Sequence, residues 1–343
     1  MKITKKFHKH LNNFNGVNKN LKHIIGTFFI SALIFTSCSK NNDDADIIIR
    51  ATPQAFNNLQ QEALEDLTQT FQFNAEDGST SFTSENGVQI YLNGSCLTLN
   101  GNTVTGQVDI EYVELFDKGN MLVTNKPTMG INENGDKALL ISGGEFFIEA
   151  TQNGAVLETG CNIQLGIPSA LTGGVDNDMI LWNGTFDENG NLAWEEDERD
   201  GAAGQGGGVF AEGNQYYAFL SDFGWSNVDR FYNDPRQKTT ILVDVPEGYD
   251  NTNCSVFLSY DGEDTGLANL DTYNTESGLF SEHYGQIPIG LECHVIFVSE
   301  EAGDWKYAIK AATIAENDVI TISDGETSIV TQEQLVNIIN TLP

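Results

Sequence analysis

Residues 145–168 decide how the rest of the chain is interpreted, and they read EFFIEATQNGAVLETGCNIQLGIP. Asn153 and Gly154 form the strongest short hairpin signal, because both residues tolerate a positive φ. On the two sides of this turn, apolar side chains occupy alternate positions: Phe146, Ile148, Ala150, Ile163, Leu165 and Ile167. A period of two predicts strands that bury one face and expose the other.

The Asn-Gly dipeptide recurs along the chain, starting at Asn86, Asn93, Asn100, Asn134, Asn183 and Asn189. Alternating apolar residues continue in other segments, at Val108, Ile110, Tyr112, Ile241, Val243 and Val245. Short strands separated by frequent turn signals are typical of antiparallel sandwiches. We therefore predict a mainly β fold with two β-sandwich domains of the immunoglobulin-like (Ig-like) type.

A helix is predicted at each end of these strands. Thr52 followed by Pro53 is an N-cap and first-turn signal, and apolar residues then recur at helical spacing. Near the other end, Thr331 and Gln334 have the spacing of a capping box, and apolar residues follow on one face. The sequence predicts an N-terminal helix over 53–70 and a short C-terminal helix after Thr331.

Changes in composition divide the chain into segments. An N-terminal helix and the first β-sandwich domain are expected over 53–168, because Pro168 interrupts the strand pattern. An acidic run and a glycine cluster indicate a polar linker or long loop over 169–215. The second β-sandwich domain and the C-terminal helix are expected over 216–343. Two domains also agree with the usual size of about 150 residues each.

The first 37 residues have the features of a signal peptide. Six lysines and no acids precede an apolar stretch over 24–35, which is shorter than the roughly 20 residues of a membrane-spanning helix. The sequence Phe35-Thr36-Ser37-Cys38 then resembles a bacterial lipobox. It predicts cleavage after residue 37 and lipidation of the Cys38 sulfur; the alternative is an ordinary thiol behind a conventional signal.

Residues 38–52 are expected to be a tether. Its polar, acid-rich beginning over 39–46 resembles the export signal that moves lipoproteins of the phylum Bacteroidota to the outer face of the outer membrane. This resemblance implies a protein attached to the outer membrane through its lipid anchor and facing the cell exterior. A tether that faces the periplasm is the alternative.

The charge of the chain excludes one class of partner. Lys and Arg number 17 against 49 Asp and Glu, which gives a formal net charge of −32. Such a surface repels phosphate backbones, so we predict no binding to nucleic acid. Glycans, divalent cations and surface proteins with basic patches remain as partners.

Cysteine usage agrees with an oxidising compartment. Beyond Cys38 there are four cysteines, which allow three pairings. We favour Cys96 with Cys161 and Cys254 with Cys293, because each pair would close a loop within one predicted domain. In the alternative, some of the four stay reduced as small buried hydrophobic residues.

Two sets of residues are candidates for binding. Oxygen-rich turns suit calcium, the one cofactor that the sequence suggests, and they contribute Asp176, Asp178, Asp187, Asp261 and Asp264 as candidate metal ligands. Each turn has a plain hairpin as its alternative, and none completes an EF-hand. An aromatic cluster with polar neighbours suits a sugar ring, and it comprises Trp225, Asp229, Arg230, Phe231 and Tyr232. Its alternative is a core aromatic beside a buried Asp229–Arg230 ion pair.

Two stretches carry a resemblance to a known group of proteins: SGGEFFIEATQNG over 142–154 and GWSNVDRFYN over 224–233. Together they resemble uncharacterised surface lipoproteins of Bacteroidota, a group without an assigned activity. The resemblance implies a lipidated, β-rich surface protein. We expect a non-catalytic module for adhesion or for binding a glycan or protein, and no enzyme. The alternatives are a surface enzyme that acts on glycans through paired carboxylates and an accessory subunit of an outer-membrane complex.

Overall fold

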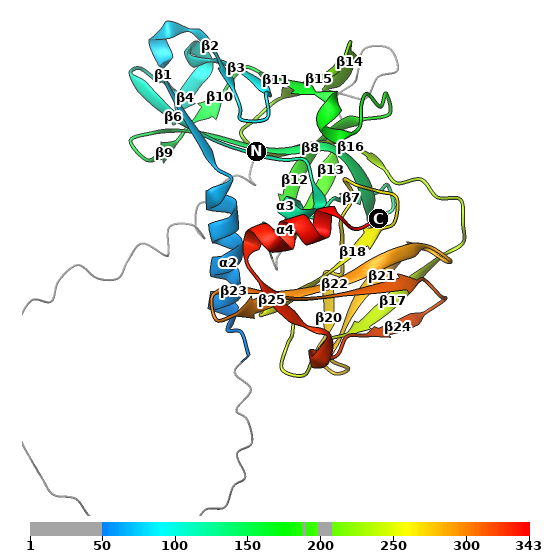
Figure 1. Ribbon diagram of the computed structural model, residues 1–343. Coiled ribbons are helices and arrows are strands. Elements are labelled where there is room, and N and C mark those ends of the chain that lie inside the picture. Colours follow the sequence, from blue (N-terminus) through cyan, green and yellow to red (C-terminus); the bar gives the residue numbers. More distant parts are fainter. Residues whose placement is uncertain (1–49, 188–189, 198–207) are drawn as a thin grey trace, which may run out of the picture. The chain divides into compact units, whose positions relative to one another are not determined.

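Strands form most of the chain that this computed structural model describes, which comprises residues 50–187, 190–197 and 208–343 (Figure 1). The prediction of a mainly β protein with a short C-terminal helix is confirmed. The signal peptide, Cys38 and most of the tether lie outside the described residues, as does most of the glycine cluster. Within the described residues, no helix is long and apolar enough to cross a membrane.

Two sheets of the first half enclose one hydrophobic core. Sheet A has the order β1-β6-β8-β16-β12-β13-β7, with β9 beside β8. Its strands are β1 (Gln69–Asn74), β6 (Gln107–Leu115), β7 (Met129–Ile131), β8 (Lys137–Gln152), β9 (Ala155–Val156), β12 (Ile180–Phe186), β13 (Leu192–Glu196) and β16 (Gly224–Phe231). Phe146 and Ile148 of β8 are buried in this core, so the alternation predicted from the sequence is confirmed there.

Sheet B supplies the other wall of this core, with the order β14-β15-β11-β3-β2. Its strands are β2 (Ser79–Thr83), β3 (Gln89–Asn93), β11 (Ile163–Pro168), β14 (Val209–Glu212) and β15 (Gln215–Leu220). Ile163, Leu165 and Ile167 of β11 face inward as predicted. A small sheet C lies beside them, formed by β4 (Leu97–Leu99), β5 (Asn102–Thr103) and β10 (Glu158–Thr159). Short 3-10 turns at Ala75–Asp77, Gly94–Cys96 and Ser169–Thr172 connect the strands.

The segment 169–215, expected as a polar linker or long loop, contains strands instead. β12 and β13 bring the fully buried Trp182 and Trp194 into sheet A, and β14 joins sheet B. β15 and β16 also pair with strands of the first half, so the chain passes to the second pair of sheets after residue 231. The acidic run indicated a loop, yet Leu192, Ala193 and Trp194 just before it are buried, and so is Asp197 within it.

Sheets D and E of the second half enclose another core. Sheet D contains β17 (Lys238–Asp244), β20 (Thr272–Asn274), β21 (Leu279–Pro288) and β24 (Asp318–Thr321). Sheet E contains β18 (Cys254–Tyr260), β19 (Ala268–Asn269), β22 (Glu292–Glu301), β23 (Asp304–Thr313) and β25 (Ser328–Val330). Ile241 and Val243 of sheet D share this core with Val256 and Phe297 of sheet E.

The helices begin where the sequence predicted. α2 (Pro53–Asp66) starts after Thr52, whose Oγ1 accepts the Ala55 N–H at 3.1 Å. It ends four residues earlier than expected, because Phe71 belongs to β1 and stacks on Phe82 of β2. α4 (Gln332–Asn340) has the predicted capping box between Thr331 and Gln334. The sequence analysis did not predict α3 (Lys118–Val123).

A third core joins the two halves through these helices. Phe56 of α2 and Leu335 of α4 pack with Leu115 of sheet A and with Ile296 and Trp305 of sheet E. The Phe56 and Trp305 rings meet edge to face, with centroids 6.1 Å apart. Figure 1 shows α4 between the strands of the first half and those of the second. Parts of the faces of sheets A and E that are turned away from their own cores are therefore buried as well, at Val113 and Leu115 and at Ile296 and Val298.

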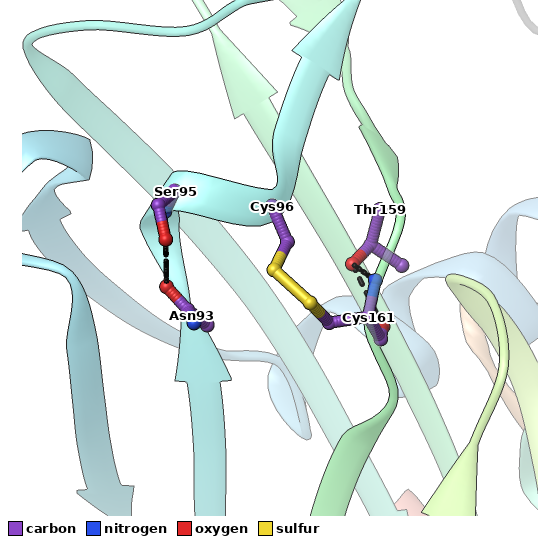
Figure 2. Close-up of a disulfide and its surroundings, with 5 residues drawn as sticks. All are labelled: Asn93, Ser95, Cys96, Thr159 and Cys161. Carbon is purple, nitrogen blue, oxygen red and sulfur yellow. Dashed lines mark hydrogen bonds between the residues drawn. A yellow bond between two sulfur atoms is a disulfide. The ribbon is translucent and has the colours of Figure 1, made fainter.

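One of the two predicted disulfides is present. Cys96 and Cys161 are bonded, with their Cα atoms 5.7 Å apart, and the bond joins the turn before β4 to the start of β11 (Figure 2). The prediction that Cys254 pairs with Cys293 is wrong, since both are free and buried. Cys254 lies opposite Ser299 and Cys293 opposite Tyr260, so the two thiols occupy opposite ends of the β18–β22 ladder. Six residues of strand span about 20 Å, far beyond the reach of a disulfide.

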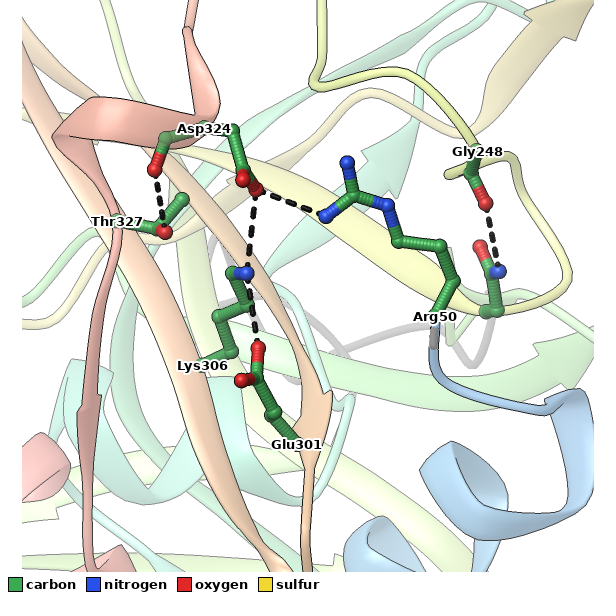
Figure 3. A network of polar contacts seen from close by, with 7 residues as sticks. Arg50, Gly248, Glu301, Lys306, Asp324 and Thr327 are labelled. Atoms are coloured by element: carbon green, nitrogen blue, oxygen red, sulfur yellow. Dashed lines mark hydrogen bonds and ion pairs between the residues drawn. The ribbon is translucent and has the colours of Figure 1, made fainter. Parts of the chain in front are cut away.

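The first described residue, Arg50, is held by a polar network (Figure 3). Its guanidinium donates to Asp324 Oδ1 at 2.8 Å and lies 4.8 Å from the centre of the Tyr249 ring. Asp324 also accepts from Lys306, which in turn donates to Glu301. The network connects Arg50, three residues before α2, to β22, β23 and the 3-10 turn Asp324–Glu326.

Candidate functional site

The two stretches that carry the resemblance pair with each other as neighbouring strands. β8 and β16 run antiparallel, with Asn227 opposite Glu145 and Asp229 opposite Ser142, and a bulge lies between the two pairs. Gly144 has φ +129°, and a Cβ there would lie 2.6 Å from the Phe116 ring. Only glycine suits this backbone and this space. The SGGE sequence therefore shapes the bulge that brings polar side chains together.

A fully buried polar cluster results, formed by Ser142, Glu145, Asn227 and Asp229, each with 0% exposure. Ser142 Oγ donates to Asn227 Oδ1 at 3.1 Å, and Asn227 Nδ2 donates to Asp229 Oδ2 at 2.6 Å. Both carboxyl oxygens of Glu145, and Oδ1 of Asp229, accept no hydrogen bond from the described residues. Unpartnered carboxyl oxygens are costly in an interior, so the neutral acid forms are favoured.

The electrostatics agree with neutral acids. Burial, assisted by the nearby Asp229, raises the pKa of Glu145 well above its usual range, against an opposing effect of Lys126. Burial also raises the pKa of Asp229. Burial lowers the pKa of Lys126 to about 8, although Glu145 acts in the other direction. Strongly shifted groups gathered in one place are a common mark of functional sites, and structural networks produce them too.

The predicted sugar-binding cluster is not assembled as a single site. Trp225 packs against Phe147 with ring centroids 5.4 Å apart, and Lys126 Nζ lies 5.3 Å from its ring centre. Asp229 is in the interior. The alternative of a buried Asp229–Arg230 ion pair is also wrong, because Arg230 Nε bonds to Asp176 Oδ2 at 2.6 Å. Consecutive strand residues face opposite sides of a sheet, which separates these two charges.

Arg230, Phe231 and Tyr232, by contrast, lie at the surface around two neighbouring hollows. The first, of about 480 Å³, is lined by the loop over 172–179 together with Ile141 and Arg230. The second, of about 460 Å³, is lined by residues from both halves of the chain: Asn132, Ala138, Asp178, Arg230, Phe231, Tyr232, Asn233, Lys238 and Gln286. Arg230 and Asp178 border both hollows, so the two form one continuous candidate site.

Hydrogen bonds fix the side chains of this site. Arg230 is held by Asp176 and donates from Nη1 to the carbonyl of Phe231 at 3.2 Å. The Phe231 ring meets the Trp182 ring edge to face at 5.0 Å. Although burial opposes the shift, hydrogen bonds from the Asp178 N–H and from Arg230 lower the pKa of Asp176. Asp176 is thus an anion that orients Arg230, and it is poorly suited to donate a proton.

The predicted metal ligands do not come together. Asp176 pairs with Arg230, Asp187 accepts from Asn191, and Asp261 bonds to His294 Nδ1 at 2.8 Å. Asp178 borders the hollows, and Asp264 lies in the turn after β18. Among the described residues, no group of three or more His, Cys, Asp or Glu side chains is arranged to hold a metal ion. Calcium binding stays a prediction.

Comparisons with known proteins add no family to this description. No protein-family model matches the chain, and a search of the curated proteins finds no match. The assignment of a function therefore depends on the geometry of the site.

Several residues of the site escaped the sequence analysis. Lys238 and Gln286 reach the second hollow from β17 and β21, and Asn132 reaches it from the turn between β7 and β8. Glu145 and Lys126 of the buried cluster were also missed. One sequence signal could have identified Lys238: lysine and arginine are scarce in so acidic a chain, so each is worth considering as a ligand-binding residue. Two of them, Arg230 and Lys238, do border the same hollow.

Proposed function

We propose that this protein is a lipid-anchored lipoprotein on the exterior of a bacterial outer membrane, of the kind found in Bacteroidota, and that it binds glycans without cleaving them. The continuous site around Arg230 carries the proposal. Its lining offers amide, hydroxyl, carboxylate and guanidinium groups from separate segments, with Phe231 and Tyr232 beside them. A few convergent polar groups in a concave site of 300 to 1,000 Å³ are typical of small-molecule sites.

The size and position of the site support a glycan over a protein partner. Two hollows in series fit successive sugar units, whose hydroxyls suit Asn132, Asp178 and Gln286. Among the described residues, the large exposed hydrophobic side chains are Tyr91, Val175, Val319 and Ile329, which belong to four separate segments. An accessory subunit would be expected to present a contiguous apolar patch, so this role has less support.

Screening the mature protein on a glycan array, followed by calorimetry with the best oligosaccharide, tests the proposal. Arg230→Met is expected to weaken binding by at least tenfold, because it removes the group shared by both hollows. Arg236→Met is the matched control: Arg236 is exposed and pairs with its own partner, Asp234. Absence of any glycan ligand for the wild-type protein, or equal binding by both variants, would contradict the proposal.

A glycan-cleaving enzyme is the second candidate, because Glu145 and Asp229 are neighbouring carboxyl groups with raised pKa values. Glycosidases use such pairs as acid and nucleophile or base. Both carboxyl groups are fully buried, however, and neither lines the hollows. Release of reducing ends from a bound oligosaccharide, lost in Glu145→Gln, would establish the enzyme; intact oligosaccharide after prolonged incubation supports the binding module.

The anchor and the domain plan complete the proposal. Palmitate labelling of the full chain, lost in Cys38→Ser together with membrane association, tests the anchor; labelling that persists in the variant would refute it. We also propose that sheets A and B, and sheets D and E, are two Ig-like sandwich domains, supported by a core within each pair; Met129, Leu139 and Ile141 of sheet A also pack into the second core. Hydrogen exchange on the intact chain should then show two groups of amides that open separately.

A further inference from the structure

The second hollow is unusual because two of the scarce cations border it, one of which, Arg230, is paired with Asp176. In a chain with 17 Lys and Arg against 49 Asp and Glu, two cations and one carboxylate line it: Arg230, Lys238 and Asp178. Seven other Lys and Arg side chains of the described residues donate to a carboxylate or a backbone carbonyl: Arg50, Lys118, Lys126, Lys137, Arg236, Lys306 and Lys310. Among the described residues, Lys238 Nζ has a single hydrogen-bond partner, the side-chain oxygen of Gln286, at 3.5 Å.

Arg230 is held in place and keeps donors available. Its Nε donates to Asp176 and its Nη1 to the Phe231 carbonyl, while the second terminal nitrogen, Nη2, makes no hydrogen bond with the described residues. A carboxylate can bind along the edge formed by these two terminal nitrogens, because each nitrogen donates a hydrogen bond to one carboxylate oxygen. Asp176 thus orients this group and leaves its outer edge for a ligand.

The remaining lining suits a hydroxylated ring. Asn132, Asn233 and Gln286 offer neutral donors and acceptors, and Phe231 and Tyr232 contribute aromatic surface. The Gln286 amide donates to Asp136 at 3.3 Å, which fixes this wall across the two halves of the chain. A volume of about 460 Å³ suits one or two sugar units.

We infer that the second hollow recognises the carboxylate of an acidic sugar, held between Arg230 and Lys238, while the amides bond the ring hydroxyls. This inference rests on the proposed glycan binding and adds the class of sugar. Acidic sugars would meet net repulsion over most of the surface, so a local pair of cations gives selectivity for a ligand with one well-placed charge rather than for a polyanion.

A matched pair of ligands tests the inference: an oligosaccharide with a single uronic acid unit, and the same oligosaccharide after reduction of that carboxyl group to a neutral alcohol. By calorimetry, wild-type protein is expected to bind the acidic form at least tenfold more tightly. Lys238→Gln should remove most of that preference, because it weakens binding of the acidic form far more than binding of the neutral form. Lys310→Gln, which removes a surface lysine paired with Glu326, is the charge-matched control and should keep the preference.

The possible outcomes separate the two proposals. Equal binding of both forms by the wild type would overturn the acidic-sugar assignment and leave glycan binding intact. No binding of either form, together with an empty glycan array, would overturn both. Tighter binding of a sulfated oligosaccharide, or competition by inorganic sulfate or phosphate at millimolar concentration, would show that the hollow selects tetrahedral anions and refute the carboxylate.

Discussion

Asp229 and Arg230 are neighbours in β16, yet they belong to two regions with opposite electrostatics. Asp229 faces the interior, where it and Glu145 have unpartnered oxygens and raised pKa values. Arg230 faces the surface, where its charge is matched by Asp176 and remains accessible in both hollows. Two carboxyl groups show what the environment does: burial raises the pKa of Asp229, whereas at the surface, although burial opposes the shift, hydrogen bonds from the Asp178 N–H and Arg230 lower the pKa of Asp176.

Gly144→Ala should break the interior region most severely. A Cβ there would lie 2.6 Å from Phe116 and 2.7 Å from Phe146, at φ +129°. Overpacking and backbone strain together should lower the free energy of unfolding by about 3 kcal/mol or more in urea denaturation. Gly224→Ala is the matched control, since φ is +126° and the space is open; it should cost about 1 to 3 kcal/mol. Equal losses would mean that the clash does not matter.

Glu145→Met should stabilise the protein at neutral pH. The wild-type carboxyl has a raised pKa in the folded state, because of burial first and then Asp229. Above the unfolded value of about 4.3, the folded state binds the additional proton, so the free energy of unfolding falls as pH rises, by up to about 1.4 kcal/mol per unit. The variant should lose the part of this slope that Glu145 contributes, keep the part that Asp229 contributes, and gain about 1 to 3 kcal/mol at pH 7.

Glu111→Met is the comparison for this substitution, because Glu111 is an exposed residue of β6. It should change stability by less than about 0.5 kcal/mol at any pH. Denaturation between pH 4 and 8 measures both variants. A wild-type stability that rises with pH across this range, with Glu145→Met less stable, would show that Glu145 is ionised and stabilised in the fold.

Asp176→Asn should have a smaller effect with the opposite sign. Although burial opposes the shift, hydrogen bonds from the Asp178 N–H and Arg230 lower the pKa of Asp176. Its contribution is therefore present above the unfolded pKa and is lost as pH falls through the folded one. Because the side chains of Asp176 and Arg230 are each about one-third exposed, we expect a loss below about 1 kcal/mol at pH 7, which shrinks as pH falls below the unfolded pKa. Greater stability of Asp176→Asn at neutral pH would contradict this assignment.

The sequence predicted some features of the fold correctly and others not, and the difference has a physical cause. Alternation at Phe146 and Ile148 and the caps at Thr52 and Thr331 are local signals, and all are present. The Cys96–Cys161 bond joins residues 65 positions apart, and it was predicted because it closes a loop within one predicted domain. The partners of a strand are not given by local sequence. β16 pairs with β8 and β12, so the chain leaves the first pair of sheets only after residue 231, later than the sequence predicted.

The candidate site shows the same limit. Residues 230–232 were identified from one aromatic stretch, and they do border the hollows. Lys238 and Gln286 come from other strands, and no spacing rule connects them to Arg230. The pairing of Cys254 with Cys293 failed likewise, since two cysteines on adjacent strands still lie far apart when they occupy opposite ends of the ladder.

The network at Arg50 determines how a mechanical load would enter the fold. In a protein tethered on its amino-terminal side, tension reaches the described unit at Arg50, before α2. Arg50 is clasped by Asp324, and the next residue, Ala51, receives a hydrogen bond from Asn253 at 3.1 Å. These two interactions would transmit the force to sheet E. The Arg50–Asp324 ion pair and the Asn253–Ala51 hydrogen bond would therefore have to break before α2 unfolds from its amino-terminal end.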